Sequence, residues 1–158
     1  MRKLTSGLLL GLALAILADA FVLAGEEKVA LDKLPKEVVK AVKAKFPKAE
    51  MASAVKSTAD GETTYEVTLK TGGLGIDVVL TSEGKITQIE KELAAKDLPR
   101  AVAVAFEAKY PKATVKRIEE LIKEDKIISY EFLIETTAKK TVEAYFDPQG
   151  KFLQEKAK

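Results

Sequence analysis

The chain has 158 residues, which is enough for one ordinary domain or two small ones. Hydrophobic residues make up 47% and charged residues 32%, a composition typical of a globular protein rather than a disordered one. The formal net charge is +2, from 26 basic and 24 acidic residues, and the lysines are spread along the whole chain. This balance argues against nucleic acid or an anionic membrane as the main partner, because both require a clustered basic surface.

The sequence contains no Cys, no His and no Trp. Disulfides, Cys/His metal sites and a lipid anchor on Cys are therefore excluded, and so is thiol or imidazole catalysis. An enzyme would have to work with carboxylates, Lys, Ser/Thr or Tyr alone. We therefore predict that the protein is not an enzyme and that it uses no cofactor.

The N-terminal segment has the pattern of a signal peptide. Arg2 and Lys3 precede a short apolar run, and small residues that suit cleavage follow it. We predict a signal peptide over residues 1–24, with cleavage after Ala24 preferred over cleavage after Ala20. The alternative, an uncleaved anchor, is disfavoured because the run is shorter than the roughly 20 apolar residues of a spanning helix. The chain is predicted to be periplasmic or secreted, without a stable membrane anchor after cleavage.

The remaining chain contains one pattern twice. A Leu-Pro pair precedes an aromatic-Pro-Lys-Ala segment at residues 34–49 and, with the same spacing, at residues 98–113. Two later segments also match their counterparts: Tyr65–Leu69 with Tyr130–Ile134, and Gly84–Ile86 with Gly150–Phe152. Internal repetition predicts two tandem units, which we assign to residues 25–93 and 94–158.

The first unit is predicted to be a helix followed by strands. Pro35 suits the start of a helix, Val38, Val42 and Phe46 form one apolar stripe, and Pro47 ends it. The lysines of the other face (Lys36, Lys40 and Lys43) are interpreted as a solvated surface rather than a site for an anionic polymer. Residues 25–33 are predicted to be a loose lead-in. Strands are predicted at 51–58, 63–71, 74–81 and 85–93, with Gly72-Gly73 as a two-residue hairpin turn.

The second unit repeats this plan. Its helix is predicted to start at Pro99 and to end at Pro111, with Val102, Phe106 and Tyr110 on the apolar stripe. Strands are predicted at 113–122, 127–137, 141–147 and 151–156. The fold class is therefore α+β: two tandem repeats, each with one helix packed on a four-stranded antiparallel β-meander. The repeats are expected to pack side by side, with residues 93–97 as a short, stiff junction.

These helix stops, strands and turns resemble the PepSY-like family, also described as the β-lactamase-inhibitor-like (BLIP-like) fold of exported bacterial proteins. The resemblance covers about residues 34–93 and 96–156. It implies exported, non-enzymatic domains, often in tandem, that bind or inhibit other proteins. It brings no catalytic residue set. The inhibitor that gives the fold its name uses disulfides and this chain has none, so its target is not carried over.

The outer face of the second sheet is the candidate binding surface. A three-residue turn at Ala138–Lys140 would set the register between the strands on either side of it. On the inner face this register pairs Phe132 with Phe146 and Ile134 with Ala144. On the outer face it predicts three pairs: Glu131 with Asp147, Leu133 with Tyr145, and Glu135 with Glu143. The corresponding pairs of the first repeat are Glu66 with Val79 and Thr68 with Asp77.

The functional interpretation of this surface is a docking face, with Tyr145 and Leu133 as the anchor and the four carboxylates as a rim for a basic partner. The competing interpretation, which the sequence favours, is that Lys116 or Lys151 neutralises the acids and that Tyr145 is an ordinary exposed aromatic. Bound Ca²⁺ would need about six oxygen ligands, and acid–base catalysis would need a deeper pocket than an open sheet provides.

The sequence thus favours an exported, non-enzymatic protein that binds another protein as an inhibitor or a sensor. The alternative function is the binding or sensing of a small ligand or of a cation such as calcium. The identity of the protein partner and the oligomeric state are not predicted. An open sheet edge offers a second way to pair with a partner.

Overall fold

The computed structural model describes residues 26–59 and 61–158, and the predicted signal peptide lies outside the described residues. The elements, in chain order, are β1 (Glu27–Lys28), η1 (Leu31–Lys33), α1 (Lys36–Lys45), β2 (Glu50–Ala59), β3 (Glu62–Thr71), β4 (Leu74–Thr81), β5 (Ile86–Glu92), η2 (Ala95–Asp97), α2 (Arg100–Lys109), β6 (Thr114–Lys123), β7 (Lys126–Glu135), β8 (Thr141–Phe146) and β9 (Phe152–Ala157).

The strands of the described residues form one antiparallel sheet, in which each strand lies beside its neighbours in sequence from β1 to β9. The α+β class with two helices is confirmed. However, the sheet is continuous instead of being divided into a separate four-stranded sheet for each repeat. The two halves are joined because β5 pairs with β6, from Ile89 opposite Ile122 to Glu92 opposite Glu119.

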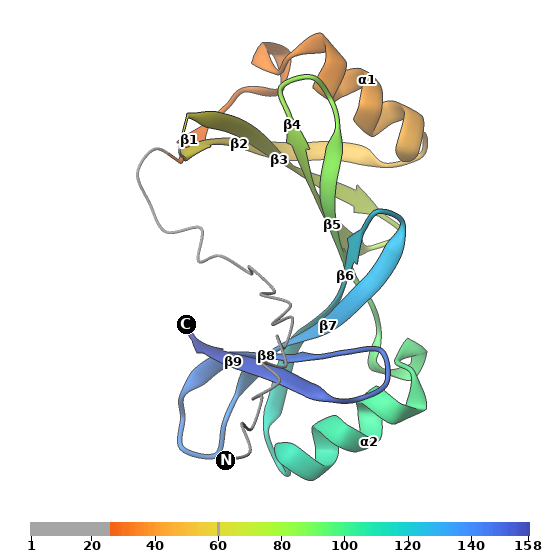
Figure 1. The fold of residues 1–158 in the computed structure, drawn as a ribbon, viewed down its shortest axis with the longest axis vertical. Helices are drawn as coiled ribbons and strands as arrows, with labels where there is room; N and C mark the ends of the chain where they lie inside the picture. The colour runs from red at the N-terminus through yellow and green to blue at the C-terminus, as the bar shows by residue number, and fades with distance from the viewer. Residues whose placement is uncertain (1–25, 60) are drawn as a thin grey trace, which may run out of the picture.

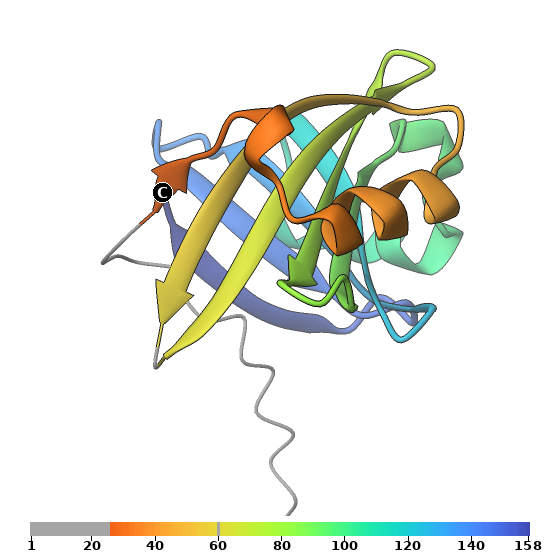
Figure 2. The same cartoon turned by 90° about the horizontal axis from the view of Figure 1, so that it is seen from above.

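The sheet curves into a C, and α1 and α2 lie on its convex side near the two ends (Figure 1). Seen from above, α1 lies across the strands of the first half (Figure 2). The face that the helices cover is apolar, as the alternation along the strands predicts. The opposite, concave face is not covered by either of these helices.

Each helix covers its own apolar core. Val38 and Val42 of α1 are buried in the first core, and Val102 and Phe106 of α2 in the second, so the predicted stripes are confirmed. In the second core, the ring of Phe106 stacks on that of Phe132 with a centroid separation of 4.2 Å. The lead-in predicted to be loose is partly ordered, since Glu27 and Lys28 of β1 pair with β2.

The matching Gly-Lys motifs have the same structural role in both repeats. Gly84 in the β4–β5 turn and Gly150 in the β8–β9 turn have φ angles of +81° and +85°. A Cβ atom on Gly84 would lie 2.6 Å from the carbonyl oxygen of Glu37, and one on Gly150 would lie 2.5 Å from that of Ala101. Both turns therefore pack directly against the backbone of the helix in their own repeat, which leaves no room for a side chain.

We expect Gly150→Ala to destabilise the protein more than Gly73→Ala. Gly73 has nearly the same φ, +84°, but a Cβ atom added to it would meet no other atom within 4 Å, so it isolates the cost of the backbone conformation. That cost is about 1 kcal/mol or somewhat more. The clash with the helix should add roughly 1–2 kcal/mol for Gly150→Ala. Urea unfolding measures both, and equal losses would show that the turn moves away from α2 without cost.

Candidate functional site

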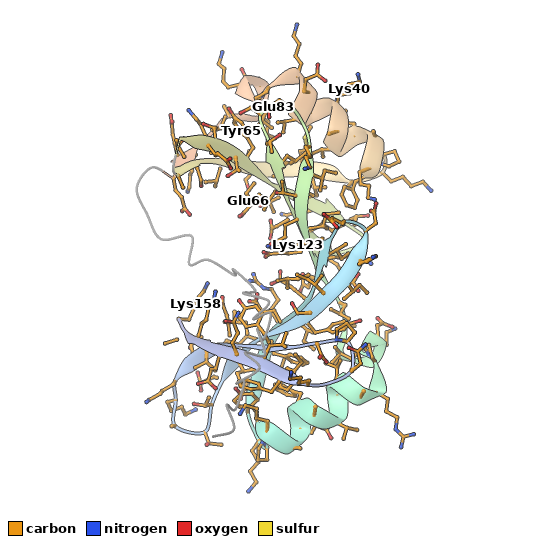
Figure 3. The ribbon with its side chains drawn as sticks, in the orientation of Figure 1. Lys40, Tyr65, Glu66, Glu83, Lys123 and Lys158 are labelled. Carbon is orange, nitrogen blue, oxygen red and sulfur yellow. The ribbon has the colours of Figure 1, made fainter. Side chains whose placement is uncertain are left out.

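The concave side of the sheet, opposite the helices, is the candidate functional surface; we call it the open face (Figure 1). Because side chains alternate along a strand, the neighbours of core residues point to this face. It carries Glu66, Asp77, Glu90, Glu92, Arg117, Glu119, Leu121, Ser129, Glu131, Leu133, Glu143 and Tyr145, contributed by β3 to β8. Figure 3 shows Glu66 and Lys158 on the concave side, at the two arms of the C.

Five carboxylates lie close together across β4 to β8; we call Asp77, Glu90, Glu119, Glu131 and Glu143 the acid cluster. Asp77 lies directly opposite Glu90, and Glu119 directly opposite Glu131. Carboxylate oxygens of Asp77, Glu90 and Glu119 all lie within 4.8 Å of one another. Like charges opposite each other destabilise a sheet, so this arrangement requires compensation.

Three members of the cluster are buried and the other two, Asp77 and Glu90, are half-buried, although neither helix covers them. Glu119, Glu131 and Glu143 are only 4%, 6% and 8% exposed, and the neighbouring Leu121 and Tyr145 are each 6% exposed. A buried carboxylate is costly unless a cation, a hydrogen bond or a proton compensates for the lost water.

Cations and hydrogen bonds provide part of this compensation. Arg117 Nε lies 3.0 Å from Glu119 Oε2, and Lys158 Nζ lies 2.6 Å from Glu143 Oε1. The Tyr145 hydroxyl donates to Glu143 Oε2 at 3.3 Å. Lys156 lies nearby, with its ammonium 5.7 Å from the centre of the Tyr145 ring.

Protonation of buried carboxyl groups provides the rest of the compensation for their burial. Burial raises the pKa of Glu119 to about 7, with Arg117 opposing the shift, and burial together with the charge of Glu143 raises the pKa of Glu131 to about 7. Burial also raises the pKa of Glu90. Burial and the two adjacent carboxylates raise the pKa of Tyr145, so its hydroxyl stays protonated and remains a donor. With pKa values of about 7, Glu119 and Glu131 therefore hold protons below neutral pH.

Four of the six predicted site residues meet on the open face, but in a different register. The structure places Glu131 opposite Tyr145, and Leu133 opposite Glu143. The predicted pairs of β7 and β8, including the inner ones, are therefore wrong by two residues, although the residues within the two strands face the predicted side. Tyr145 is buried, so its interpretation as an exposed aromatic is also wrong. In the first repeat, Glu66 opposite Val79 and Thr68 opposite Asp77 are confirmed.

The other two predicted residues have structural contacts at the ends of the strands. Glu135 lies opposite Thr141 and not Glu143; it pairs with Lys139 at 2.9 Å and with Lys116 at 3.5 Å, as the neutralisation hypothesis predicts for Lys116. Asp147 does not face Glu131. Its carboxylate accepts hydrogen bonds from the backbone N–H groups of the β8–β9 turn, at 2.9 and 2.8 Å. A role for either residue in partner binding stays a prediction.

Comparison with protein families decides the relationship of the chain. The model of the family described as "Putative beta-lactamase-inhibitor-like, PepSY-like" matches residues 23–88 and again residues 81–154. The chain belongs to this PepSY-like family. The two matches confirm the tandem repeats, while the boundary between residues 93 and 94 stays a prediction. No curated protein matches the chain.

Solved structures share the fold of this PepSY-like chain at low sequence identity. A "putative periplasmic" protein from Bacteroides eggerthii has a TM-score of 0.67 and 18% identity, covering 78% of this chain and 88% of its own. A DUF2874 family protein from Bacteroides uniformis has a TM-score of 0.66 and 17% identity, with coverages of 78% and 88%. A "BLIP-like" protein from Bacteroides fragilis has a TM-score of 0.60 and 22% identity, with coverages of 77% and 84%. These similarities show the fold alone.

The part of this surface that comes from β4 to β6 was not predicted from the sequence of this PepSY-like chain. Asp77, Glu90, Arg117 and Glu119 belong to the same surface as Tyr145 because β5 pairs with β6. The signal was present in the sequence, since Glu119 and Leu121 alternate with buried Ile118. Two separate sheets were expected, however, so residues of the two repeats were not placed on one face.

Proposed function

We propose that this chain is an exported, non-enzymatic binding protein that docks another protein on its open face, as an inhibitor or a sensor. The observation that carries the proposal is a helix-free sheet face on which the partly exposed Leu133 lies among acidic side chains, beside the buried Leu121 and Tyr145. Apolar and aromatic anchors surrounded by charged groups are typical of protein interfaces. The carboxylates favour a partner with a basic surface.

Export is supported by the charged and apolar pattern at the N-terminus and by the "putative periplasmic" protein of similar fold. Within residues 26–59 and 61–158, no helix is long and apolar enough to cross a membrane. An inhibitor or sensor role is supported by membership of a family described as inhibitor-like. A role in catalysis is disfavoured because the sequence contains neither His nor Cys.

The second hypothesis is binding of a small ligand or a cation. The convergent oxygens of Asp77, Glu90 and Glu119 are the feature that bears on it. Three carboxylates fall short of the six or more oxygen ligands that Ca²⁺ takes, so we do not assign them as a metal site. A calcium-dependent rise in melting temperature would favour this hypothesis over protein docking.

A pull-down from periplasmic extract tests the docking proposal. The chain from residue 25 onward is the bait, beside a variant with Leu133→Ser and Tyr145→Phe. The Phe substitution removes the hydroxyl but keeps the buried ring, so the sheet should fold. We expect the wild type to retain a partner and the variant to retain at least about tenfold less, as for loss of a central anchor.

The matched control is Val104→Ser, because Val104 is apolar, 58% exposed and lies on α2, away from the open face. It should retain as much partner as the wild type. Circular dichroism checks that all three proteins are folded. Equal retention by wild type and double variant would move the interface to the helices or to a sheet edge. Retention by none of them would place ligand or cation sensing ahead of protein docking.

A further inference from the structure

We propose that docking on the open face exchanges protons for cationic side chains, so that binding strengthens as the pH rises. Arg or Lys side chains of the partner would take the place of protons held by the acid cluster. This inference rests on the proposed function, because it concerns the regulation of the same surface. It identifies the partner by its chemistry, a polypeptide that presents positive charge to the concave side of the sheet.

The geometry of the cluster carries the inference. Asp77 and Glu90 come from the first repeat and Glu119 and Glu131 from the second, so the carboxylates converge where the two halves of the sheet meet. The cluster lies at the middle of the open face and not on its rim. A guanidinium or an ammonium group seated there would replace a proton with a full positive charge and several hydrogen-bond donors.

Charged groups surround the two most buried acids from every adjacent strand. Glu119 faces Asp77 of β4, Glu90 and Glu92 of β5, Arg117 of β6 and Glu131 of β7. Glu131 faces Glu119 and Arg117 of β6, Glu90 of β5, and Glu143 and Tyr145 of β8. Lys158 pairs with Glu143, and Lys156 lies opposite Glu143 on β9. Glu66 and Glu92 add two further carboxylates to the five of the acid cluster, and Arg117, Lys156 and Lys158 bring positive charge next to it.

Thermodynamic linkage turns this arrangement into a pH dependence. With the pKa of Glu119 and of Glu131 at about 7, the free protein holds protons in this cluster below neutral pH. A cation that binds the ionised cluster must expel them. For each proton expelled, the affinity should rise about 30-fold between about pH 5.5 and about pH 8.

Isothermal titration calorimetry with a cationic probe tests the inference. The probe is an acetylated, amidated tetra-arginine peptide, and the control is the isosteric peptide in which neutral citrulline replaces arginine. Titrations at about pH 5.5 and about pH 8, at one low ionic strength, give the pH dependence. Repeating each in two buffers of different ionisation enthalpy counts the protons released. We expect at least tenfold tighter binding at the higher pH, with net proton release and no binding of the citrulline peptide.

The variant Glu119→Gln with Glu131→Gln removes the two exchangeable protons, and Glu107→Gln, an exposed site on α2, is the matched control. The double variant should bind the probe with an affinity that changes little with pH, whereas the control should behave as wild type. Circular dichroism at both pH values confirms that each protein is folded.

An affinity independent of pH, or binding without proton release, would overturn the inference. So would equal pH dependence in the double variant, or no binding of the arginine peptide at either pH. None of these outcomes removes the docking proposal, since a partner captured through Leu133 and Tyr145 would still establish it. Conversely, the peptide could bind with proton release while the pull-down retains no partner. The open face would then bind cations in a pH-dependent way, and its protein partner would be absent from the extract.

Discussion

Raising the pH from about 5 to about 8 is expected to lower the free energy of unfolding by about 3–5 kcal/mol. The cause is the pair of buried acids at the centre of the open face, Glu119 and Glu131, which are 4% and 6% exposed. Their pKa values are about 7 in the folded protein, compared with 4.5 for an unperturbed glutamate. One pKa unit corresponds to about 1.4 kcal/mol, and the two acids interact, so their contributions add incompletely.

The sign follows from proton linkage. A carboxyl group whose pKa is raised on folding binds its proton more tightly in the folded state than in the unfolded state. The stability that this provides is fully present below the unfolded pKa of 4.5 and is lost as the pH rises through about 7. This is the reverse of ordinary acid denaturation, in which paired carboxylates lose stability as the pH falls.

Urea unfolding followed by circular dichroism at several pH values measures this slope. The variant Glu119→Gln with Glu131→Gln should flatten it and should be more stable than the wild type at about pH 8, since a neutral amide replaces each buried charge. Glu107→Gln, on the exposed side of α2, should keep the wild-type slope. Constant or rising stability between about pH 5 and about pH 8 would show that both acids ionise in the fold without cost.

The elements and their faces could be predicted because they depend on local patterns. The apolar stripe of Val38 and Val42 and the proline stops determine the helices, and alternation determines the side of the sheet on which Glu131 and Tyr145 lie. The Gly72-Gly73 hairpin was predictable because a type I′ turn suits a two-residue connection between twisted strands and needs positive φ at both central residues, +57° and +84° here, which glycine adopts readily.

The register of β7 and β8 depends on a backbone conformation that could not be predicted from the residue types in the turn. The turn closes between Thr136 and Lys140, whose backbone groups hydrogen-bond at 2.9 Å, and Lys139 has a φ of +62°. Gly84 and Gly150 occupy the same place in their turns, so glycine marks the left-handed residue there. In the β7–β8 turn this left-handed position is occupied by Lys139 and not by a glycine. The turn was therefore predicted one residue too far along the chain. A shift of one residue in the turn moves the pairing by two.

The acid cluster could not be predicted from either repeat alone, because it is assembled across the seam between β5 and β6. The alternation of side chains along each strand predicts the face to which Asp77, Glu90 and Glu119 point. It does not predict that the strands of the two repeats join edge to edge. Only the joined sheet places these carboxylates within 4.8 Å of each other. The same seam links the two cores, since Ile122 of β6 packs against the first core and Leu93, just after β5, against the second.

We expect Phe132→Ala to lower the free energy of unfolding by about 3–5 kcal/mol, a large part of the 5–15 kcal/mol typical of a domain. Phe132 is fully buried and stacks on Phe106 of α2, with the ring of Phe146 edge-on at 5.6 Å. The substitution removes both aromatic contacts and leaves a cavity under the helix. Calorimetry and urea unfolding measure the loss.

The matched variant is Leu69→Ala, an equally buried position of the first core, for which about 2–5 kcal/mol is expected. Because the two halves share one sheet and neither repeat of some 65 residues is stable enough to stand easily alone, each variant should still unfold in a single transition. Two separate transitions in the Phe132→Ala protein would show that the β5–β6 seam does not couple the halves. The acid cluster would then lie on a hinge between two independently folding units, and its ionisation would act on their orientation as well as on their stability.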